Sequence, residues 1–147
     1  MEGLGSRPAD AEGVRLALLR RYQILDTPED AAFDRITELA ARVFQAPIAV
    51  VSFVDRERQW FKSHFGLNIT ETPRDTSFCA FTILSDQVMV VSDAAKDERF
   101  RHREMVVGNC KIRFYAGAPL IAPEGFRLGA LASFVALSRP SWLGAMS

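Results

Sequence analysis

The sequence has few of the residues that would place it in a metal-binding or disulfide-rich class. Its 147 residues include two cysteines, Cys79 and Cys110, and two histidines, His64 and His102. Two widely separated cysteines do not make the disulfide framework of a small secreted protein. Neither cysteine has a second cysteine or a histidine at the spacing that zinc sites use. We therefore expect reduced thiols and no metal site.

An excess of one charge and long hydrophobic runs are also lacking. The 18 basic residues balance the 18 acidic ones, and no long basic run is interleaved with aromatic residues, which argues against nucleic-acid binding. No stretch approaches the ~20 apolar residues of a membrane span. The first thirteen residues are acidic and glycine-rich and do not have the shape of a signal peptide. The sequence predicts a cytoplasmic protein that contacts neither nucleic acid nor membrane.

The chain does have enough apolar content, 48% of its residues, for one globular domain with a core. Its organising feature is the stretch 111–135, in which two arms of apolar and small residues flank the turn residues Pro123, Glu124 and Gly125. This pattern predicts a β-hairpin covered on both faces. Gly117 and the alanines around it weaken strand propensity, which indicates close approach by a packed helix or a ligand.

Two helices are predicted before this hairpin. In residues 11–25 the apolar positions Val14, Leu18, Tyr22 and Leu25 follow helical spacing. This helix either docks on the domain's own core or pairs with a second copy of the chain. Thr27 as N-cap and Pro28 at the first helical position begin a second helix that ends near Phe44. Its apolar stripe, expected to face the core, consists of Phe33, Ile36, Leu39, Ala40 and Val43.

The other segments are shorter. A β-branched run at 48–54 and the segment 59–65 predict a second hairpin across a charged turn. Asp75 or Ser77 can cap a short apolar helix. The remaining expectations are a flexible lead-in at 1–10, a loop at 66–74, a strand at 88–91, an irregular lid or binding loop at 92–109, and a loose tail at 138–147.

Five segments, taken together and in this order, resemble the GAF domain, a small sensory module of signalling proteins. They are LDTPEDAAFDRIT at 25–37, PIAVVSFVDRERQWFKSHFGL at 47–67, ETPRDTSFCA at 71–80, VVSDAAKDERF at 90–100 and IRFYAGAPL at 112–120. The resemblance covers residues 25–131, and we place the domain at 26–137. It implies an α+β fold with a central antiparallel sheet of about five strands. The N-terminal helices lie on one face, and a short helix and a long loop cover a ligand pocket on the other.

Domains of this bacterial branch typically precede a histidine kinase, a cyclic-dinucleotide synthase or a phosphodiesterase domain. The chain departs from the branch at Phe81, where a histidine is usual, and at Ala132 and Ser133, where a cysteine and aliphatic residues are usual. It reads Ala136 and Leu137 where an acidic residue follows the last strand, and the C-terminal signalling helix is missing. The resemblance is thus to a GAF domain truncated at its C-terminus, whose output domain is missing or supplied by another chain.

A small, mostly apolar ligand pocket is predicted under the 75–108 region. Its residues are Phe78, Cys79, Phe100, Phe114 and Tyr115, with Tyr115 or Arg113 as the polar group. The alternative is that these aromatic residues simply fill the core. The ligand stays unknown, because the chain lacks the haem, bilin, metal and cyclic-nucleotide signatures of other GAF subgroups. Asn109, Lys111 and Phe114 are followed by no Asp-Glu pair, and neither cysteine precedes a histidine.

Three functions are open at this point. The leading one is a sensory module that binds a small molecule, has no catalytic output of its own, and serves a two-component or similar signalling protein. The second is a small cysteine-dependent oxidoreductase of the GAF-type methionine sulfoxide reductase kind, although neither histidine is near Cys79 in sequence to activate it. The third is a truncated, silent fragment. We also predict a weak homodimer through Val14, Leu18, Tyr22 and Leu25.

Overall fold

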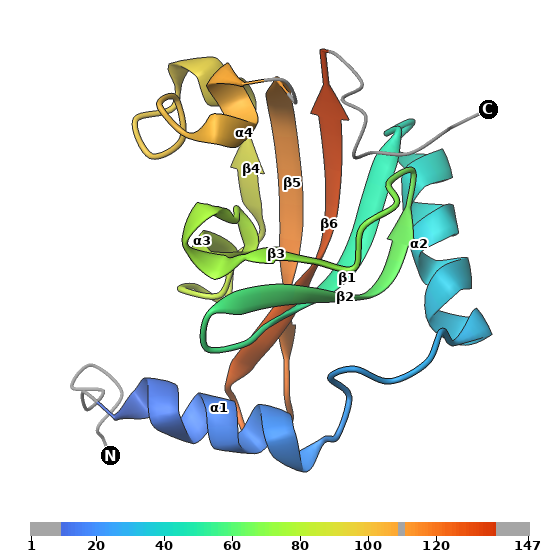
Figure 1. Cartoon of the computed structure of the whole chain (residues 1–147), viewed down its shortest axis with the longest axis vertical. Helices are drawn as coiled ribbons and strands as arrows, with labels where there is room; N and C mark the ends of the chain where they lie inside the picture. Colours follow the sequence, from blue (N-terminus) through green and yellow to red (C-terminus); the bar gives the residue numbers. More distant parts are fainter. Residues whose placement is uncertain (1–9, 109–110, 138–147) are drawn as a thin grey trace.

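A six-stranded antiparallel sheet forms the centre of the computed structural model, which describes residues 10–108 and 111–137 (Figure 1). The strand order is β3-β2-β1-β6-β5-β4. The predicted α+β class is confirmed, with one strand more than expected, because part of the predicted 66–74 loop pairs with β2 as β3. The strands are β1 Ile48–Val54, β2 Arg58–Phe65, β3 Glu71–Pro73, β4 Met89–Val91, β5 Ile112–Ile121 and β6 Arg127–Ala136.

Both predicted hairpins are confirmed. Strands β5 and β6 pair along almost their whole length, and Gly125 takes a positive φ of 93° in the turn between them. Glycine adopts this left-handed conformation without steric cost, which explains its place there. Strand β6 lies between β5 and β1, so it is a central strand with apolar residues on both faces.

Helix α1, Ala11–Arg21, corrects the predicted 11–25 helix. It is four residues shorter, since Gln23 adopts a positive φ of 54° after the helix, and Leu25 lies beyond it. The buried residues are Arg15, Leu16, Leu18 and Leu19, whereas Val14 and Tyr22 are exposed. The prediction that Val14, Leu18, Tyr22 and Leu25 form one stripe is therefore wrong. A dimer stays a prediction, but these four residues cannot form its interface together, because Leu18 packs on the chain's own sheet.

Helix α2, Ala31–Val43, corrects a second expectation. Its N-cap is Asp30, whose carboxylate accepts a hydrogen bond from the backbone N–H of Ala32, so the helix begins later than Thr27 and Pro28 suggest. The buried positions are Thr37 and Ala41, while Ile36, Leu39, Val43 and Phe44 are exposed. Of the predicted stripe only Phe33 packs against the core and Ala40 is half-buried, so the stripe as a whole does not face the core. The polar Thr37 faces the sheet instead, because its hydroxyl lies 2.7 Å from Ser63 Oγ on β2.

The two helices share one face of the sheet, and short elements cover the other, as the resemblance implies. Helix α1 contacts β6, and α2 contacts β1 and β2 (Figure 1). The covering elements are η1 Arg74–Thr76, α3 Cys79–Thr82, η2 Ala94–Lys96 and α4 Glu104–Val107. Ser77 Oγ accepts the Ala80 N–H and so starts α3. The lead-in 1–9, residues 109–110 and the tail 138–147 lie outside the described residues. In the described part, no helix is long and apolar enough to cross a membrane.

Candidate functional site

Aromatic rings fill the space between the sheet and its cover, where the ligand pocket was predicted. Phe78 before α3 and Phe100 between η2 and α4 stack with their centroids 4.2 Å apart, and Phe78 also contacts Tyr115 of β5 at 4.9 Å. Phe134 of β6 completes the cluster, 5.0 Å from Tyr115. Phe78, Phe100 and Tyr115 are at most 1% exposed. Stacked and tilted pairs of this kind stabilise by roughly 0.5–1.5 kcal/mol beyond the area that they bury.

A small polar group lies inside this aromatic cluster. The Tyr115 hydroxyl is 2.6 Å from Thr82 Oγ1 and 3.5 Å from Cys79 Sγ, to which it donates. Ser52 of β1 lies next to Cys79, yet its hydroxyl makes no hydrogen bond of ordinary geometry with any described group. A buried polar atom without a partner costs free energy. Ser52 therefore marks a point where a further hydrogen-bonding group would stabilise the protein.

Gly117 shows why small residues recur in β5. A Cβ atom built on Gly117 would lie 2.1 Å from the Tyr115 hydroxyl, because the Tyr115 ring lies over the glycine backbone. The close approach that the sequence indicated at Gly117 thus comes from the chain's own tyrosine. Gly117 is required so that the ring can reach Thr82 and Cys79.

Four of the six predicted pocket residues come together, and two do not. Phe78, Cys79, Phe100 and Tyr115 all belong to one buried cluster. Arg113 instead donates from Nη1 to the backbone oxygens of Val106, at 2.9 Å, and Ile112. Phe114 follows Arg113 in β5 and pairs with Val135, so it alternates to the face opposite Tyr115. Sequence reasoning missed Ser52 and Thr82, although a serine within the apolar run IAVVSFV was a visible signal.

Cys79 has the surroundings of a structural thiol. It is fully buried, and burial raises the pKa of its thiol, which the polar neighbours Ser52 and Tyr115 offset only in part. The attacking species in cysteine chemistry is the thiolate, which this environment disfavours. His64 contacts the Leu67 carbonyl through Nδ1, 2.9 Å away, and Cys110 lies outside the described residues. Among residues 10–108 and 111–137, no group of His, Cys, Asp or Glu could hold a metal ion.

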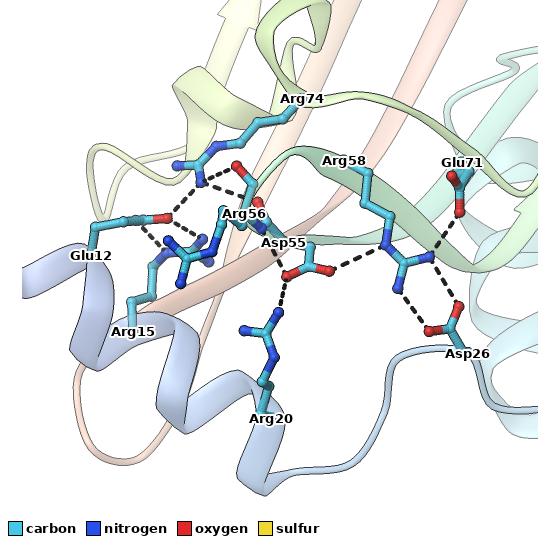
Figure 2. Close-up of polar contacts among 9 residues, drawn as sticks. All are labelled: Glu12, Arg15, Arg20, Asp26, Asp55, Arg56, Arg58, Glu71 and Arg74. Atoms are coloured by element: carbon cyan, nitrogen blue, oxygen red, sulfur yellow. Dashed lines mark hydrogen bonds and ion pairs between the residues drawn. The ribbon is translucent and has the colours of Figure 1, made fainter.

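A second polar cluster, which the sequence analysis did not predict, ties α1 to the rest of the domain (Figure 2). Glu12 of α1 accepts hydrogen bonds from Arg15 Nε at 2.9 Å and from Arg74 Nη1 of η1 at 2.5 Å. Partial burial opposes ionisation, but these bonds from Arg15 and Arg74 lower the pKa of Glu12 to about 2. Arg74 also donates to the Asp55 carbonyl at 3.0 Å. Through Arg74, Glu12 thus links α1 to the backbone of the turn between β1 and β2.

Asp55 at the start of that hairpin turn is the second link. Its carboxylate accepts from Arg20 Nη2 of α1 at 3.0 Å and from Arg58 Nε at 3.2 Å (Figure 2). Burial raises its pKa, yet the Arg56 N–H and then Arg58 outweigh burial, and the pKa of Asp55 lies below its usual range. Arg58 also pairs with Asp26 in the linker after α1 and with Glu71 of β3. These contacts and the apolar packing of Leu18 and Leu19 hold α1 on the sheet.

The antiparallel sheet, the helices on one face and the covered aromatic cluster on the other define a GAF-like fold. The sequence model of the family described as "GAF domain" matches residues 28–143. The chain belongs to this family. It is also 46% identical over 120 residues to the cyclic di-GMP phosphodiesterase PA2567 of Pseudomonas aeruginosa. That match covers 82% of this chain and 20% of the phosphodiesterase, so the chain spans about a fifth of its relative.

Solved structures agree with the fold. The GAF domain of an Acinetobacter phosphoenolpyruvate-protein phosphotransferase gives a TM-score of 0.57 at 15% identity, covering 86% of this chain and 79% of that domain. A type II free methionine-R-sulfoxide reductase from Thermoplasma acidophilum gives 0.57 at 8% identity, covering 80% and 77%. At these identities the similarity shows the shared fold alone.

Proposed function

We propose that the chain is a regulatory GAF module of a cyclic di-GMP signalling protein and has no catalytic output of its own. Its 46% identity to a segment of a cyclic di-GMP phosphodiesterase supports this proposal. The described residues supply no activated nucleophile and no metal ligand group, as the burial of Cys79 illustrates. The output domain belongs either to the same polypeptide or to a partner, and the module works in the cytoplasm with it.

The module senses a small molecule at the aromatic site. The observation that carries this proposal is the buried Ser52 hydroxyl, which makes no hydrogen bond of ordinary geometry with a described group, beside Cys79 and close to the Tyr115 and Thr82 pair. A ligand with an apolar ring and one hydroxyl or carbonyl group suits such a site. Its ring can pack against the aromatic side chains, and its polar group can form a hydrogen bond with the Ser52 hydroxyl. A ligand enters this site only when the stacked rings of Phe78 and Phe100 separate. Because Phe100 belongs to the segment that covers the site, between η2 and α4, this segment moves when the ring of Phe100 moves.

Binding is tested with phenol, which has a ring and one hydroxyl, against toluene, which has the ring alone. A ligand that binds the folded state raises the melting temperature. We expect phenol to stabilise the native chain more than toluene does, and the difference to vanish in Ser52→Ala. If neither compound shifts the transition, or if phenol acts equally on Ser52→Ala, the aromatic site is a filled core, as the alternative reading of the sequence holds.

Regulation is tested in the Pseudomonas phosphodiesterase, with its matching segment replaced by residues 10–143 of this chain, which include α1 and its packing on the sheet. We expect the chimera to keep the cyclic di-GMP phosphodiesterase activity of the natural enzyme, and a deletion of the segment to change it. Ser52→Ala in the chimera should alter activity, whereas Val107→Glu on the exposed side of α4 should not. A chimera that behaves like the deletion would rule out a regulatory role in this context.

The oxidoreductase alternative shares only its fold with the Thermoplasma reductase, and the burial of Cys79 argues against it. Assayed with free methionine sulfoxide and a dithiol reductant, the native chain and Cys79→Ser should both be inactive. Activity that depends on Cys79 would replace the regulatory proposal.

A further inference from the structure

The face of the sheet that carries α1 and α2 is only partly covered. Helix α2 lies over β1 and β2, whereas β4 and β5 form the other edge of the sheet (Figure 1). A groove of about 220 Å³ follows on this open half. Its lining residues come from α2 and the loop after it, from the residue before β4, and from the middle of β5 and β6: Ala40, Phe44, Val88, Ala116, Gly117, Ala118, Leu131, Ala132 and Ser133.

The walls of the groove are apolar and exposed. Of the residues that line it, Phe44 is 69% exposed and Val88 60%. Val90, two residues after Val88, and Val43 and Ile36 of α2, three and four residues from Ala40, lie beside the lining and expose about half or more of their side chains. Val90 pairs with Ala116, which places both on the groove's face of the sheet. The floor consists mainly of small residues, so another segment can approach the strands closely. The small residues of β5 predicted that another group approaches the strand closely. Tyr115 is that group at Gly117, on the face with the aromatic cluster, but it does not account for Ala116 and Ala118 on the groove's face.

The size of this exposed area helps to identify what covers it. A fully buried Val, Leu, Ile or Phe side chain is worth about 1.5–3 kcal/mol at about 25 cal/mol per Å², or roughly 60–120 Å² each. The five exposed apolar residues in and beside the groove, exposed by about half to two thirds, therefore offer on the order of 200–400 Å². A stable dimer interface buries about 800 Å² on each partner. The groove is too small for such an interface, but it suits a short segment of the same chain.

We propose that residues 138–147, which the structure does not describe, dock in this groove with Trp142 and Leu143 as anchors. The segment reads SRPSWLGAMS, has Arg139 as its one charged side chain, and directly follows β6, which lines the groove. Leu131 to Ser133 lie three to five residues before the end of β6, or roughly 10–17 Å along the strand. Trp142 is the sixth residue after Ala136, a distance of up to ~20 Å when the chain is extended.

Two further observations support a return of the chain to the groove. Pro140 and Ser141, immediately before Trp142, are residue types that favour turns. The GAF family match also continues to residue 143, seven residues past the end of β6, so this segment belongs to the domain and not to a linker beyond it. Trp142 is the largest apolar side chain in the segment and therefore gains most from burial in the groove.

Trp142 provides its own readout, because the chain has only one other tryptophan, Trp60 of β2. In Trp60→Phe, Trp142 is the sole tryptophan, and its emission and quenching by acrylamide report its exposure. We expect blue-shifted emission and a quenching constant severalfold lower than in the urea-unfolded chain. Val88→Glu, which puts a charge on the exposed groove wall, should return Trp142 toward the unfolded values. Val107→Glu is the matched control, since Val107 is equally exposed but lies on α4 across the sheet.

Each outcome decides the proposal. Trp142 that is quenched as freely in the folded as in the unfolded protein overturns it, as does protection that survives both Val88→Glu and the second groove variant Ala118→Glu. Protection that appears only as protein concentration rises, together with a dimer in sedimentation, assigns the groove to a second copy and also overturns it. Concentration-independent protection that is lost in Val88→Glu and kept in Val107→Glu supports docking of residues 138–147.

Discussion

A leucine-to-alanine substitution should destabilise the protein more in α1, at Leu19, than in α2, at Leu39. The apolar periodicity of the sequence suggests the reverse, because it places Leu39 on the stripe expected to face the core. Leu19 of α1 is fully buried among Leu18, Val51, Phe53 and Trp60, whereas Leu39 of α2 is 63% exposed. Leu19→Ala removes packed atoms and leaves a cavity, which costs about 2–5 kcal/mol. Full burial of a leucine side chain stabilises by about 1.5–3 kcal/mol, and only about a third of the Leu39 side chain is buried. Leu39→Ala should therefore lower the free energy of unfolding by about 0.5–1 kcal/mol.

Urea unfolding followed by circular dichroism measures both changes from the shift of the transition midpoint at constant slope. A domain of this size has a total stability of about 5–15 kcal/mol, so the loss at Leu19 is large and that at Leu39 is small. Leu39 is next to Ala40 in α2, but one residue corresponds to about 100° of rotation, so Leu39 does not line the groove that Ala40 lines. If Leu39→Ala costs as much as Leu19→Ala, the orientation of α2 described above is wrong.

Three further predictions follow from the aromatic site and the network around α1. Phe100→Ala should cost about 3–5 kcal/mol in urea unfolding, because Phe100 holds the covering segment on the sheet through its stack with Phe78; a loss below about 1 kcal/mol would show that the cover is held elsewhere. Gly117→Ala should cost about 1–3 kcal/mol by overpacking against Tyr115, whereas Gly13→Ala, with no atom near its added Cβ, should cost nothing; equal effects on thermal melting would contradict this account. Glu12→Gln should destabilise at neutral pH. The folded pKa of Glu12 is about 2 against about 4.3 unfolded, so the stability from its ionised form is complete above the unfolded value and is lost as the pH falls toward 2. The difference between native protein and Glu12→Gln should therefore close between about pH 5 and pH 2, and it should be modest because Glu12 is partly exposed; a pH-independent difference would contradict this.

The sequence pointed to the candidate site but not to its polar chemistry. Phe78, Cys79, Phe100 and Tyr115 could be grouped because family-like segments place them under one cover, and the structure brings them into one cluster. Arg113 and Phe114 were adjacent in sequence to Tyr115, yet strand alternation and the bond of Arg113 to Val106 take them out of it. Ser52 and Thr82 come from other elements, and only the packed structure shows that their hydroxyls lie beside Cys79 and Tyr115.

The two hairpins and the existence of both N-terminal helices could be predicted from the sequence alone. Turn residues such as Gly125, runs of β-branched residues and helical spacing act locally, so they can be recognised without knowledge of the rest of the fold. Which side of each helix meets the sheet depends instead on contacts between elements that are distant in sequence. Periodicity shows which residues share a face but not what that face contacts, and on α2 the hydrogen bonds of Ser63 to Thr37 and Asp34 turn a polar side inward and leave Leu39 in solvent. The ion pairs of Glu12 and Asp55 likewise join residues 62 and 35 positions apart in sequence, and only the folded chain brings these charges together.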